Sequence, residues 1–500
     1  MEDNKILLPE VDKEKLVFVQ QDTTIFDQKF ETKKIGYLQD ALIRFSKNKG
    51  SVVAFVILCI MILFSLIVPF FARYGVNEYD LVYANVLPKV ASFEGSGFWD
   101  GTKVKVDNEK NYEYFYYHGA AEFISQDGTN VKFRFDSYEN VGYQYLDLSE
   151  DRYNNMMAYI AENPDSDILY PLVDRTWYKN DSSIPSSKYS KFEAKYEYDA
   201  NYYYKINANE YVQKDASGNP VTVYLTNPTD NPNLITGEDG LVYAQKTGST
   251  YRVRVLYKNY YKMLHGEYAC FAFGADNFGK DIFVRLAVGG RLSLLLGFSV
   301  SLINIILGLI YGSIEGYYGG LADLIMERIV DILNDVPFII IATLFQLYFA
   351  KKVGVIPTLL FAFVLTGWIG VAARTRMQFY RYKGQEYVLA ARTLGAKDSR
   401  LIFRHILPNA IGPLITGAVL MIPGVIFSES MLSYLNIIDL STSNLTSIGT
   451  MLNSSKSVYT QYPHEMLFPA IFISLLMICF NIFGNGLRDA FNPSLRGVDE

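Results

Sequence analysis

Five stretches of this chain are apolar and uncharged over about 20 residues, the length of helix that crosses roughly 30 Å of hydrocarbon. A sixth, 336–350, reaches that length only when it is extended back through Ile329, which takes in Asp331 and Asp335. We therefore expect an all-α polytopic membrane protein with six transmembrane helices. The five clear stretches are 51–72, 292–314, 353–373, 406–428 and 466–487.

A polar segment, 74–272, separates the first apolar stretch from the others. It holds 28 Asp and Glu against 19 Lys and Arg, a balance of 19 − 28 = −9, whereas the whole chain carries −6. Alternating stretches at 131–135 and 251–257 predict half-buried strands, and 149–162 predicts a helix. We expect an inserted α+β domain, mostly β. Cys270 is its only cysteine, so no disulfide can form within it.

Basic residues beside short membrane segments mark the cytoplasmic side. The loop 374–408 carries eight of them against only Glu386 and Asp398, so we expect it inside: Arg374, Arg376, Arg381, Lys383, Arg392, Lys397, Arg400 and Arg404. Alternation of six spans then puts both termini in the cytoplasm and 74–272 outside. Residues 1–50 are expected to be a cytoplasmic segment, loosely ordered over 1–34, with a short interfacial helix over 35–45. Residues 51–73 are the first span, and 273–500 hold the other five.

The most informative motif is Glu386-Tyr-Val-Leu-Ala-Ala-Arg-Thr-Leu-Gly-Ala, followed by Phe403-Arg-His-Ile-Leu-Pro-Asn. A short helix of small residues with a glycine turn and basic neighbours suits a groove on another protein. The motif resembles the cytoplasmic signature of ABC importer permeases, Glu-Ala-Ala, three residues, Gly, nine residues, Ile-x-Leu-Pro. Leu389 replaces the Glu of that signature and His405 its first Ile. The residues that the resemblance assigns to ATPase coupling are Glu386, Ala390, Ala391, Arg392, Leu394, Gly395, Ala396, Arg404, His405, Leu407 and Pro408.

The resemblance covers 34–74 and 273–500, including Gly316-Tyr-Tyr-Gly-Gly, Leu432-Ser-Tyr-Leu and Gly484-Asn-Gly-Leu-Arg-Asp-Ala-Phe-Asn-Pro. It is closest to the C-type permease of bacterial oligopeptide or dipeptide importers, and it implies a fold like that of type I ABC importer permeases in the plasma membrane. It implies as partners a homologous B-type permease, two ABC ATPase subunits and an extracytoplasmic peptide-binding protein, with peptide as cargo. ATP and Mg would bind to the ATPases, and no cofactor or nucleic acid to this chain. Asn436 replaces a usual Gly, and the segment 74–272 is the largest departure.

A second glycine-containing motif matches the pattern of a nucleotide-binding site only in part. Gly274-Ala-Asp-Asn-Phe-Gly-Lys-Asp has the glycine and lysine spacing of a phosphate-binding loop, but Asp281 stands where Ser or Thr would hold magnesium. No strand leads into it. We therefore expect the energy source to be another chain, and we do not expect this chain to be an enzyme.

Three carboxylates near the membrane are candidates for a translocation path. Asp331 and Asp335 are four residues apart and share a helix face; they line a polar path or lie at the level of the inner headgroups. Glu429, at the outer end of the fifth span, contacts the amino end of a peptide or pairs with a neighbouring subunit.

Other functions stay open at this stage. The shared motifs concern the ATPase and not the cargo, so nickel chelates, glutathione or another small solute are alternatives to peptides. A transporter or channel that needs no ATPase would carry ionisable groups at mid-membrane, and these spans are nearly charge-free. A membrane-anchored receptor would bind ligand through 74–272, although five further spans exceed what an anchor needs.

Overall fold

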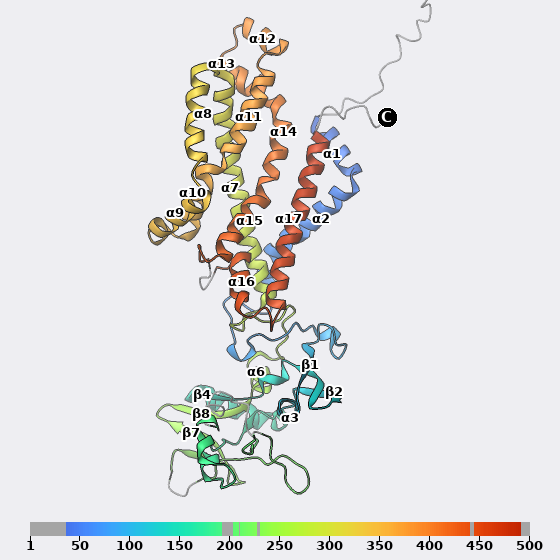
Figure 1. Cartoon of the computed structure of the whole chain (residues 1–500), viewed down its shortest axis with the longest axis vertical. Helices are drawn as coiled ribbons and strands as arrows, with labels where there is room; N and C mark the ends of the chain where they lie inside the picture. The colour runs from blue at the N-terminus through green and yellow to red at the C-terminus, as the bar shows by residue number, and fades with distance from the viewer. Residues whose placement is uncertain (1–36, 193–203, 210, 228–230, 441–444, 492–500) are drawn as a thin grey trace, which may run out of the picture.

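The computed structural model describes residues 37–192, 204–209, 211–227, 231–440 and 445–491. The expectation for 1–34 lies outside these residues. A bundle of long helices stands on a smaller domain of strands and short helices (Figure 1). The ends of the bundle differ: α12 (Glu386–Thr393), α13 (Asp398–Arg400), α1 and the end of α17 lie at one end, and the domain lies at the other.

The bundle is built from helices that follow the apolar stretches. Within the described residues, five helices are long and apolar enough to span a membrane, or six if α8 and α9, which meet at a 72° bend, form one span. The bundle helices are α1 (Tyr37–Lys47), α2 (Lys49–Phe71), α7 (Ile282–Tyr318), α8 (Gly320–Asn334), α9 (Phe338–Val353), α10 (Val355–Gly367), α11 (Ile369–Tyr382), α14 (Leu407–Val419), α15 (Met421–Tyr434), α16 (Ile448–Ser454) and α17 (His464–Phe491).

Three spans differ from the expected bounds, and one of them, 353–373, is divided between α10 and α11 and continues to Tyr382. The stretch 292–314 is part of α7, which has 37 residues and includes the buried Arg285 and Glu315. The stretch 406–428 is divided between α14 and α15, and the helix continues to Tyr434. Glu315 and Glu429 marked predicted ends of the other two, but the partners of their carboxylates, Arg376 and Ser293, lie within the bundle, so each helix passes through its charged residue.

Glycines on α7 allow it to pack closely against α11. A Cβ at Gly308, Gly312 or Gly316 would lie 2.5, 2.2 or 2.7 Å from the nearest α11 atom, too close for any side chain. These glycines are four residues apart and so share one helix face. The spacing is the small-residue pattern of membrane helix pairs, in which packing rather than hydrophobic burial holds helices together.

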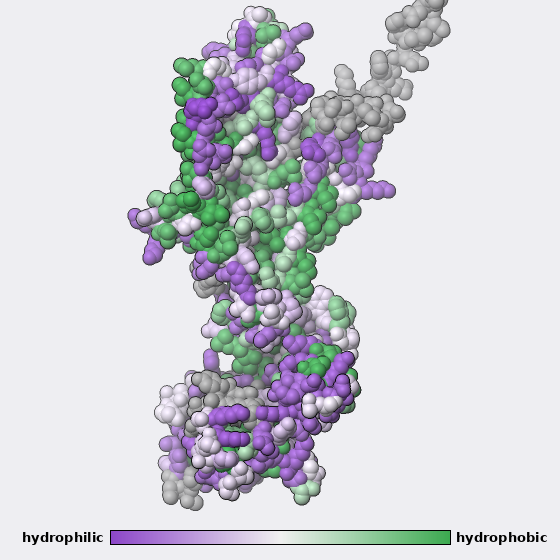
Figure 2. Space-filling model, viewed as in Figure 1, coloured by the Kyte–Doolittle hydropathy of each residue, from purple (hydrophilic) through white to green (hydrophobic). Residues whose placement is uncertain are grey.

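The surface of the bundle suits a bilayer. Figure 2 shows hydrophobic side chains over the middle of the bundle and hydrophilic ones over the domain and over the α12 end. Apolar side chains of α2 and α7 such as Ile60, Leu295 and Leu302 are 57–60% exposed. Lipid is the environment in which such exposure is stable.

The domain contains two antiparallel sheets. The first has the order β1-β3-β2 and packs against α3 (Glu109–Tyr117); its strands are β1 (Thr102–Asn108), β2 (Ala121–Asp127) and β3 (Asn130–Asp136). The second has the order β4-β8-β7-β6, with β5 also paired to β8. Its strands and helices are β4 (Tyr143–Ser149), α4 (Glu150–Glu162), β5 (Leu169–Tyr170), β6 (Leu234–Thr236), β7 (Val242–Thr247), β8 (Thr250–Leu256) and α6 (Tyr257–His265).

The alternating stretches at 131–135 and 251–257 fall on β3 and β8, and the helix expected over 149–162 is α4, capped by Ser149. The sheets and helices are those of an α+β domain. Its core is unusually aromatic: Tyr83 and Tyr138 are buried there with Tyr257 and Tyr261. Short 3-10 turns lie at Leu81–Tyr83, Ala91–Phe93, Glu139–Val141, Pro164–Ser166, Trp177–Asn180, Ser186–Lys188 and Ser455–Ser457.

Aromatic and ionic contacts fasten the domain to the bundle. The Trp99 ring stacks on Phe273 and on Phe468 of α17, and the two phenylalanine rings lie 4.2 Å apart. Arg285 of α7 forms a buried ion pair with Asp276 in the segment before α7, and the backbone oxygen of Asp276 accepts the N–H of Asn85 in the domain. The domain is thus packed against the outer ends of α7 and α17.

The motif Gly274 to Asp281, whose glycine and lysine spacing is that of a phosphate-binding loop, is part of this junction. The Asp276 carboxylate accepts the backbone N–H groups of Phe278 and Lys280, which closes a tight turn. A Cβ at Gly279 would lie 1.8 Å from the backbone oxygen of Asp80. The glycine is needed for chain packing, which accounts for the motif without a nucleotide.

Candidate functional site

The expected coupling loop folds as a compact cap on the end of the bundle. After α11 the chain turns into α12, passes Gly395 and α13, and enters a π-helical turn at Leu401–Ile406 that leads into α14. Val388, Leu401 and Ile406 are completely buried against Phe379 and Tyr317. The apolar spacing of this segment therefore builds a small core of its own, and α12 rests on the ends of α7 and α11.

Polar contacts fix the loop to α7. The Tyr317 hydroxyl donates to the Asp398 carboxylate at 2.6 Å, and Arg392 donates to the same hydroxyl at 3.5 Å. Lys383 donates to the backbone oxygen of Gly316 at 2.9 Å. A displacement of α12 would strain these bonds unless α7 followed.

The outer face of the loop is solvent-exposed and partly apolar. Leu394 is 88% exposed, and Tyr387, Leu389 and Phe403 are 41–58% exposed. An apolar group of this kind on a basic surface is typical of a protein contact. The predicted coupling residues divide between the two faces: Glu386, Ala390, Arg392, Leu394, Gly395, Arg404 and Pro408 are exposed, whereas Ala391, Ala396, His405 and Leu407 are half-buried.

Gly395 has a role within the chain. Its φ is +80°, a left-handed conformation that only glycine adopts readily, and nothing lies within 4 Å of a Cβ built there. The residue is therefore required by the turn that ends α12. Space for a partner is present at the same position.

An ion network beneath the loop was not predicted. Arg376 of α11 makes a bidentate contact with Asp323 of α8 at 2.7 and 3.0 Å. It also contacts Glu327 at 2.9 and 3.1 Å, and Glu315 of α7 at 3.5 Å. Tyr380 donates to Asp323 at 2.6 Å. One guanidinium thus joins three helices directly below the cap.

Glu429 lies inside the bundle. Its side chain is 0% exposed and accepts hydrogen bonds from the hydroxyls of Ser293 at 2.9 Å, Ser433 at 3.1 Å and Ser430 at 3.3 Å. The carboxyl group joins α7 to α15, because Ser293 belongs to α7. Its role in a translocation path stays a prediction, and this geometry gives it no open face.

Asp331 and Asp335 are both exposed near the end of α8. Asp331 pairs with Arg328 at 2.8 Å, and its backbone oxygen accepts the N–H of Asp335. Both precede the bend between α8 and α9. Their role in a path also stays a prediction.

Two family models and several known proteins match the sequence of the bundle. A family model described as the binding-protein-dependent transport system inner membrane component matches residues 304–497, and one described as the N-terminal TM domain of oligopeptide transport permease C matches 36–88. The oligopeptide transport system permease protein OppC of Bacillus subtilis (strain 168) is 45% identical over 224 residues, 45% of this chain and 72% of that relative. The chain belongs to the oligopeptide and dipeptide transport permease family, as a C-type subunit.

Other relatives of this permease have similar coverage. The dipeptide transport system permease protein DppC of Bacillus subtilis is 39% identical over 225 residues, 45% of this chain and 69% of that protein. OppC of Escherichia coli (strain K12) is 37% identical over 225 residues, with 72% of that protein covered. Among solved structures, an inward-facing MetNI methionine ABC transporter chain covers 42% of the permease and 96% of itself, with 16% identity and a TM-score of 0.36.

Neither family model includes residues 89–303, which contain both sheets of the domain. The Arg376 network of the permease, in contrast, lies within the matched part. Asp323 and Glu327 are four residues apart, a spacing that puts both on one helix face and was available in the sequence. Arg376 lies 49 and 53 positions away from them, and no local pattern connects it to them.

Proposed function

We propose that this permease is the C-type transmembrane subunit of an ATP-driven ABC importer for oligopeptides or dipeptides. It forms the path together with a homologous B-type permease. Two ABC ATPase subunits hold ATP and Mg, and an extracytoplasmic peptide-binding protein delivers the cargo. The observation that carries this proposal is the 45% identity to an oligopeptide permease over 72% of that relative's length.

The shape of the expected coupling loop supports an interaction with an ATPase subunit. Its outer face offers Leu394 and Phe403 among exposed basic side chains, whereas its inner face is bonded to α7. The surface is therefore available to a second protein while the cap stays attached to the bundle. A permease that worked without an ATPase would have no use for such a surface.

The charge distribution supports an orientation with the cap in the cytoplasm. The basic loop 374–408, α1 and the end of α17 lie at one end of the bundle, and the acidic domain lies at the other (Figure 1). Positive charge beside membrane segments stays in the cytoplasm. The domain is then extracytoplasmic.

The contacts suggest how ATPase closure reaches the spans. Closure moves α12 and α13, and the bonds of Arg392 and Asp398 to Tyr317 transfer that movement to α7. Arg376 holds α8 and α11 to α7, so the three helices move together. ATP binding opens the path outward and hydrolysis resets it, a rearrangement of packed helices between two states.

Gly395→Val tests the coupling role. A β-branched residue at φ +80° is strained by at least about 1–2 kcal/mol, which displaces the end of α12. Gly384→Val is the matched control, because Gly384 lies in the same loop, has ordinary φ and has nothing within 4 Å of its Cβ position. Tagged complexes would be purified, and peptide-stimulated ATPase activity and peptide uptake measured in proteoliposomes.

We expect both variants to assemble, with uptake uncoupled from ATP turnover only in Gly395→Val. Unchanged uptake in that variant would overturn the coupling assignment. Recovery of the wild-type chain without a second permease or ATPase would overturn the importer itself. Stimulation by a nickel chelate or glutathione in place of peptides would change only the cargo.

A further inference from the structure

Two adjoining cavities lie at the foot of the extracytoplasmic domain, and neither is used by the mechanism above. The larger has a volume of about 470 Å³ and the smaller about 260 Å³. Both are lined by Lys89 and Glu94, so this ion pair stands between them. The larger cavity also touches Arg73, where the chain leaves α2, and Cys270, shortly before α7.

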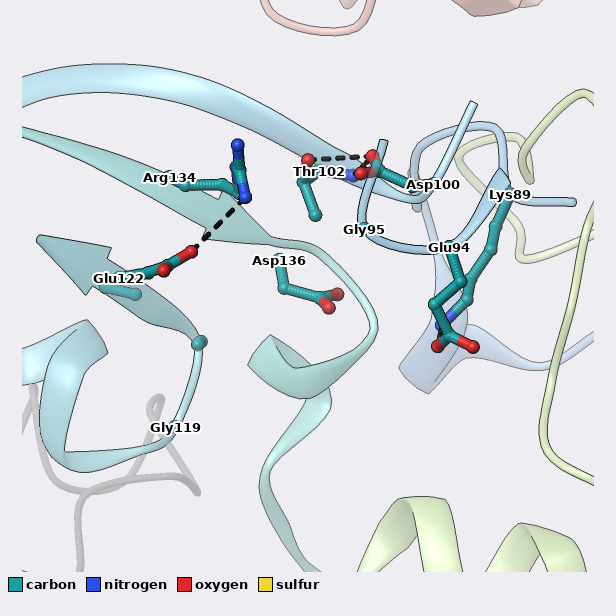
Figure 3. Close-up of a pocket in the computed structure, with 11 residues that line it drawn as sticks. Lys89, Glu94, Gly95, Asp100, Thr102, Gly119, Glu122, Arg134 and Asp136 are labelled. Atoms are coloured by element: carbon teal, nitrogen blue, oxygen red, sulfur yellow. Dashed lines mark hydrogen bonds and ion pairs between the residues drawn. The ribbon is translucent and has the colours of Figure 1, made fainter. Parts of the chain in front are cut away.

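The smaller cavity has an excess of negative charge. Four carboxylates line it against two cations, and Figure 3 shows Asp136 between the Arg134–Glu122 pair and the Lys89–Glu94 pair. Asp136 accepts two backbone N–H groups, from Tyr138 and Glu139, on one oxygen. Among the described residues, no cation lies within ion-pair distance of its carboxylate. Partial burial raises the pKa of Asp136, so a cation beside it would be stabilising.

The other residues of this cavity are already satisfied. Asp100 accepts from the backbone N–H groups of Gly97 and Thr102 and from the Thr102 hydroxyl. Glu122 pairs with Arg134 at 3.3 Å. The remaining wall is made of small residues that leave room for a ligand: Gly95, Gly119, Ala120 and Ala121.

The larger cavity offers positive charge whose partners can be replaced. The Lys89 side chain is only 18% exposed, but Glu94, 3.2 Å from it, is 71% exposed. Lys258 pairs with Glu139 at 2.6 Å at the same cavity. An exposed ion pair is worth at most about 1 kcal/mol, so a ligand carboxylate can take the place of Glu94 at little cost. Tyr83 and Tyr138 add aromatic surface to the wall.

We propose that the two cavities form one binding site for a short peptide with free ends. Its ammonium group lies beside Asp136 in the smaller cavity, and its carboxylate replaces Glu94 beside Lys89 and Lys258 in the larger. The larger cavity alone falls within the range of about 300–1,000 Å³ that is usual for small-ligand sites. The site rests on the proposed function, because it takes the same class of cargo. It gives the domain a role as a receiving site on the permease itself.

The experiment is a binding titration of the full chain in lipid nanodiscs, without the binding protein. The probes are trialanine, N-acetyl-trialanine and trialanine amide, measured by calorimetry. The variants are Asp136→Asn, which keeps an oxygen for the two backbone N–H groups, and Lys89→Gln. The controls are Asp127→Asn and Lys132→Gln, exposed positions on the same sheet that line neither cavity.

We expect trialanine to bind to the wild-type chain. Acetylation or amidation of the peptide, and each of the substitutions Asp136→Asn and Lys89→Gln, should weaken binding at least tenfold, whereas the two control variants should bind trialanine as the wild type does. Equal binding of capped and free peptides, or no binding at all, would overturn the site. The capped peptides test the same claim on the unaltered chain if a variant fails to fold. Uptake by the assembled wild-type importer separates the two proposals: peptide uptake without binding to this chain removes only the site, whereas a lack of peptide uptake removes the proposed function.

Discussion

Leu394 is the sharpest test of the coupling surface. Its side chain is 88% exposed, so Leu394→Ser removes almost no packing from the chain itself, and stability should change by no more than about 0.5 kcal/mol. If an ATPase subunit covers the side chain, the variant forfeits most of the roughly 1.5–3 kcal/mol gained by burying a leucine. Each ~1.4 kcal/mol is a factor of ten in affinity. The ATPase should therefore bind roughly 10- to 150-fold more weakly.

The assay is a titration of purified ATPase subunit against nanodisc-embedded permease, followed by light scattering or fluorescence anisotropy. Leu81→Ser is the matched control, because Leu81 is also a largely exposed leucine, at 64%, but lies at the foot of the domain, at the other end of the bundle from the loop. Its affinity for the ATPase should not change. Thermal unfolding of both variants checks that each is folded.

An unchanged dissociation constant for Leu394→Ser would refute the assignment of this face to the ATPase. An equal loss in both leucine variants would also refute it, because the effect would then come from general damage. A loss confined to Leu394, with the melting temperature kept, is the expected result.

Three further predictions concern stability and are checked by unfolding in detergent. Arg376→Ala leaves the buried Glu315 and the half-buried Asp323 without their cation and should destabilise the permease by up to roughly 3 kcal/mol, the low end for a buried pair, whereas Arg381→Ala on the same helix should change it little. Gly279→Ala should lower the melting temperature clearly, because its Cβ would lie 1.8 Å from the backbone oxygen of Asp80 and its φ is +72°. Burial raises the pKa of Asp281 from 3.8 to about 7, so its contribution to stability is complete below about pH 4 and is lost as pH rises through 7. Asp281→Asn should abolish that part of the pH dependence, and an unchanged slope would contradict it.

Length and polarity predicted the helices well because hydrocarbon admits few alternatives. The predicted ends of the spans were wrong where a charged side chain is buried. Glu429 ended the predicted fifth span, but three serine hydroxyls hold its carboxyl group, and α15 continues to Tyr434. No rule of sequence separation pairs Ser293 with Glu429, 136 positions apart. The coupling role of the 386–408 motif stays a prediction, and its contact with Tyr317, 81 positions from Asp398, could not be predicted from spacing.

The fold of the domain could likewise be predicted from the sequence only in part. Alternation predicted β3 and β8, but one of the strands beside β8 is β4, with Tyr143 opposite Leu256. One hundred residues separate these strands, and alternation gives the face of a strand without giving its neighbour. The cavities at the foot of the domain depend on such distant pairings. No motif predicted Lys89, Glu94 and Asp136 as neighbours.

The attachment of the domain connects its cavities to the transport cycle. Trp99 stacks on Phe468 of α17, and the backbone N–H of Asn85 donates to Asp276, which pairs with Arg285 of α7, so two separate contacts connect the domain to α17 and α7. A relative movement of these two helices must either carry the foot of the domain with one of them or break one of the contacts. Both contacts are largely buried, and breaking the ion pair would leave a charge without its partner. We therefore expect the foot of the domain to move with the ends of α7 and α17 that it contacts.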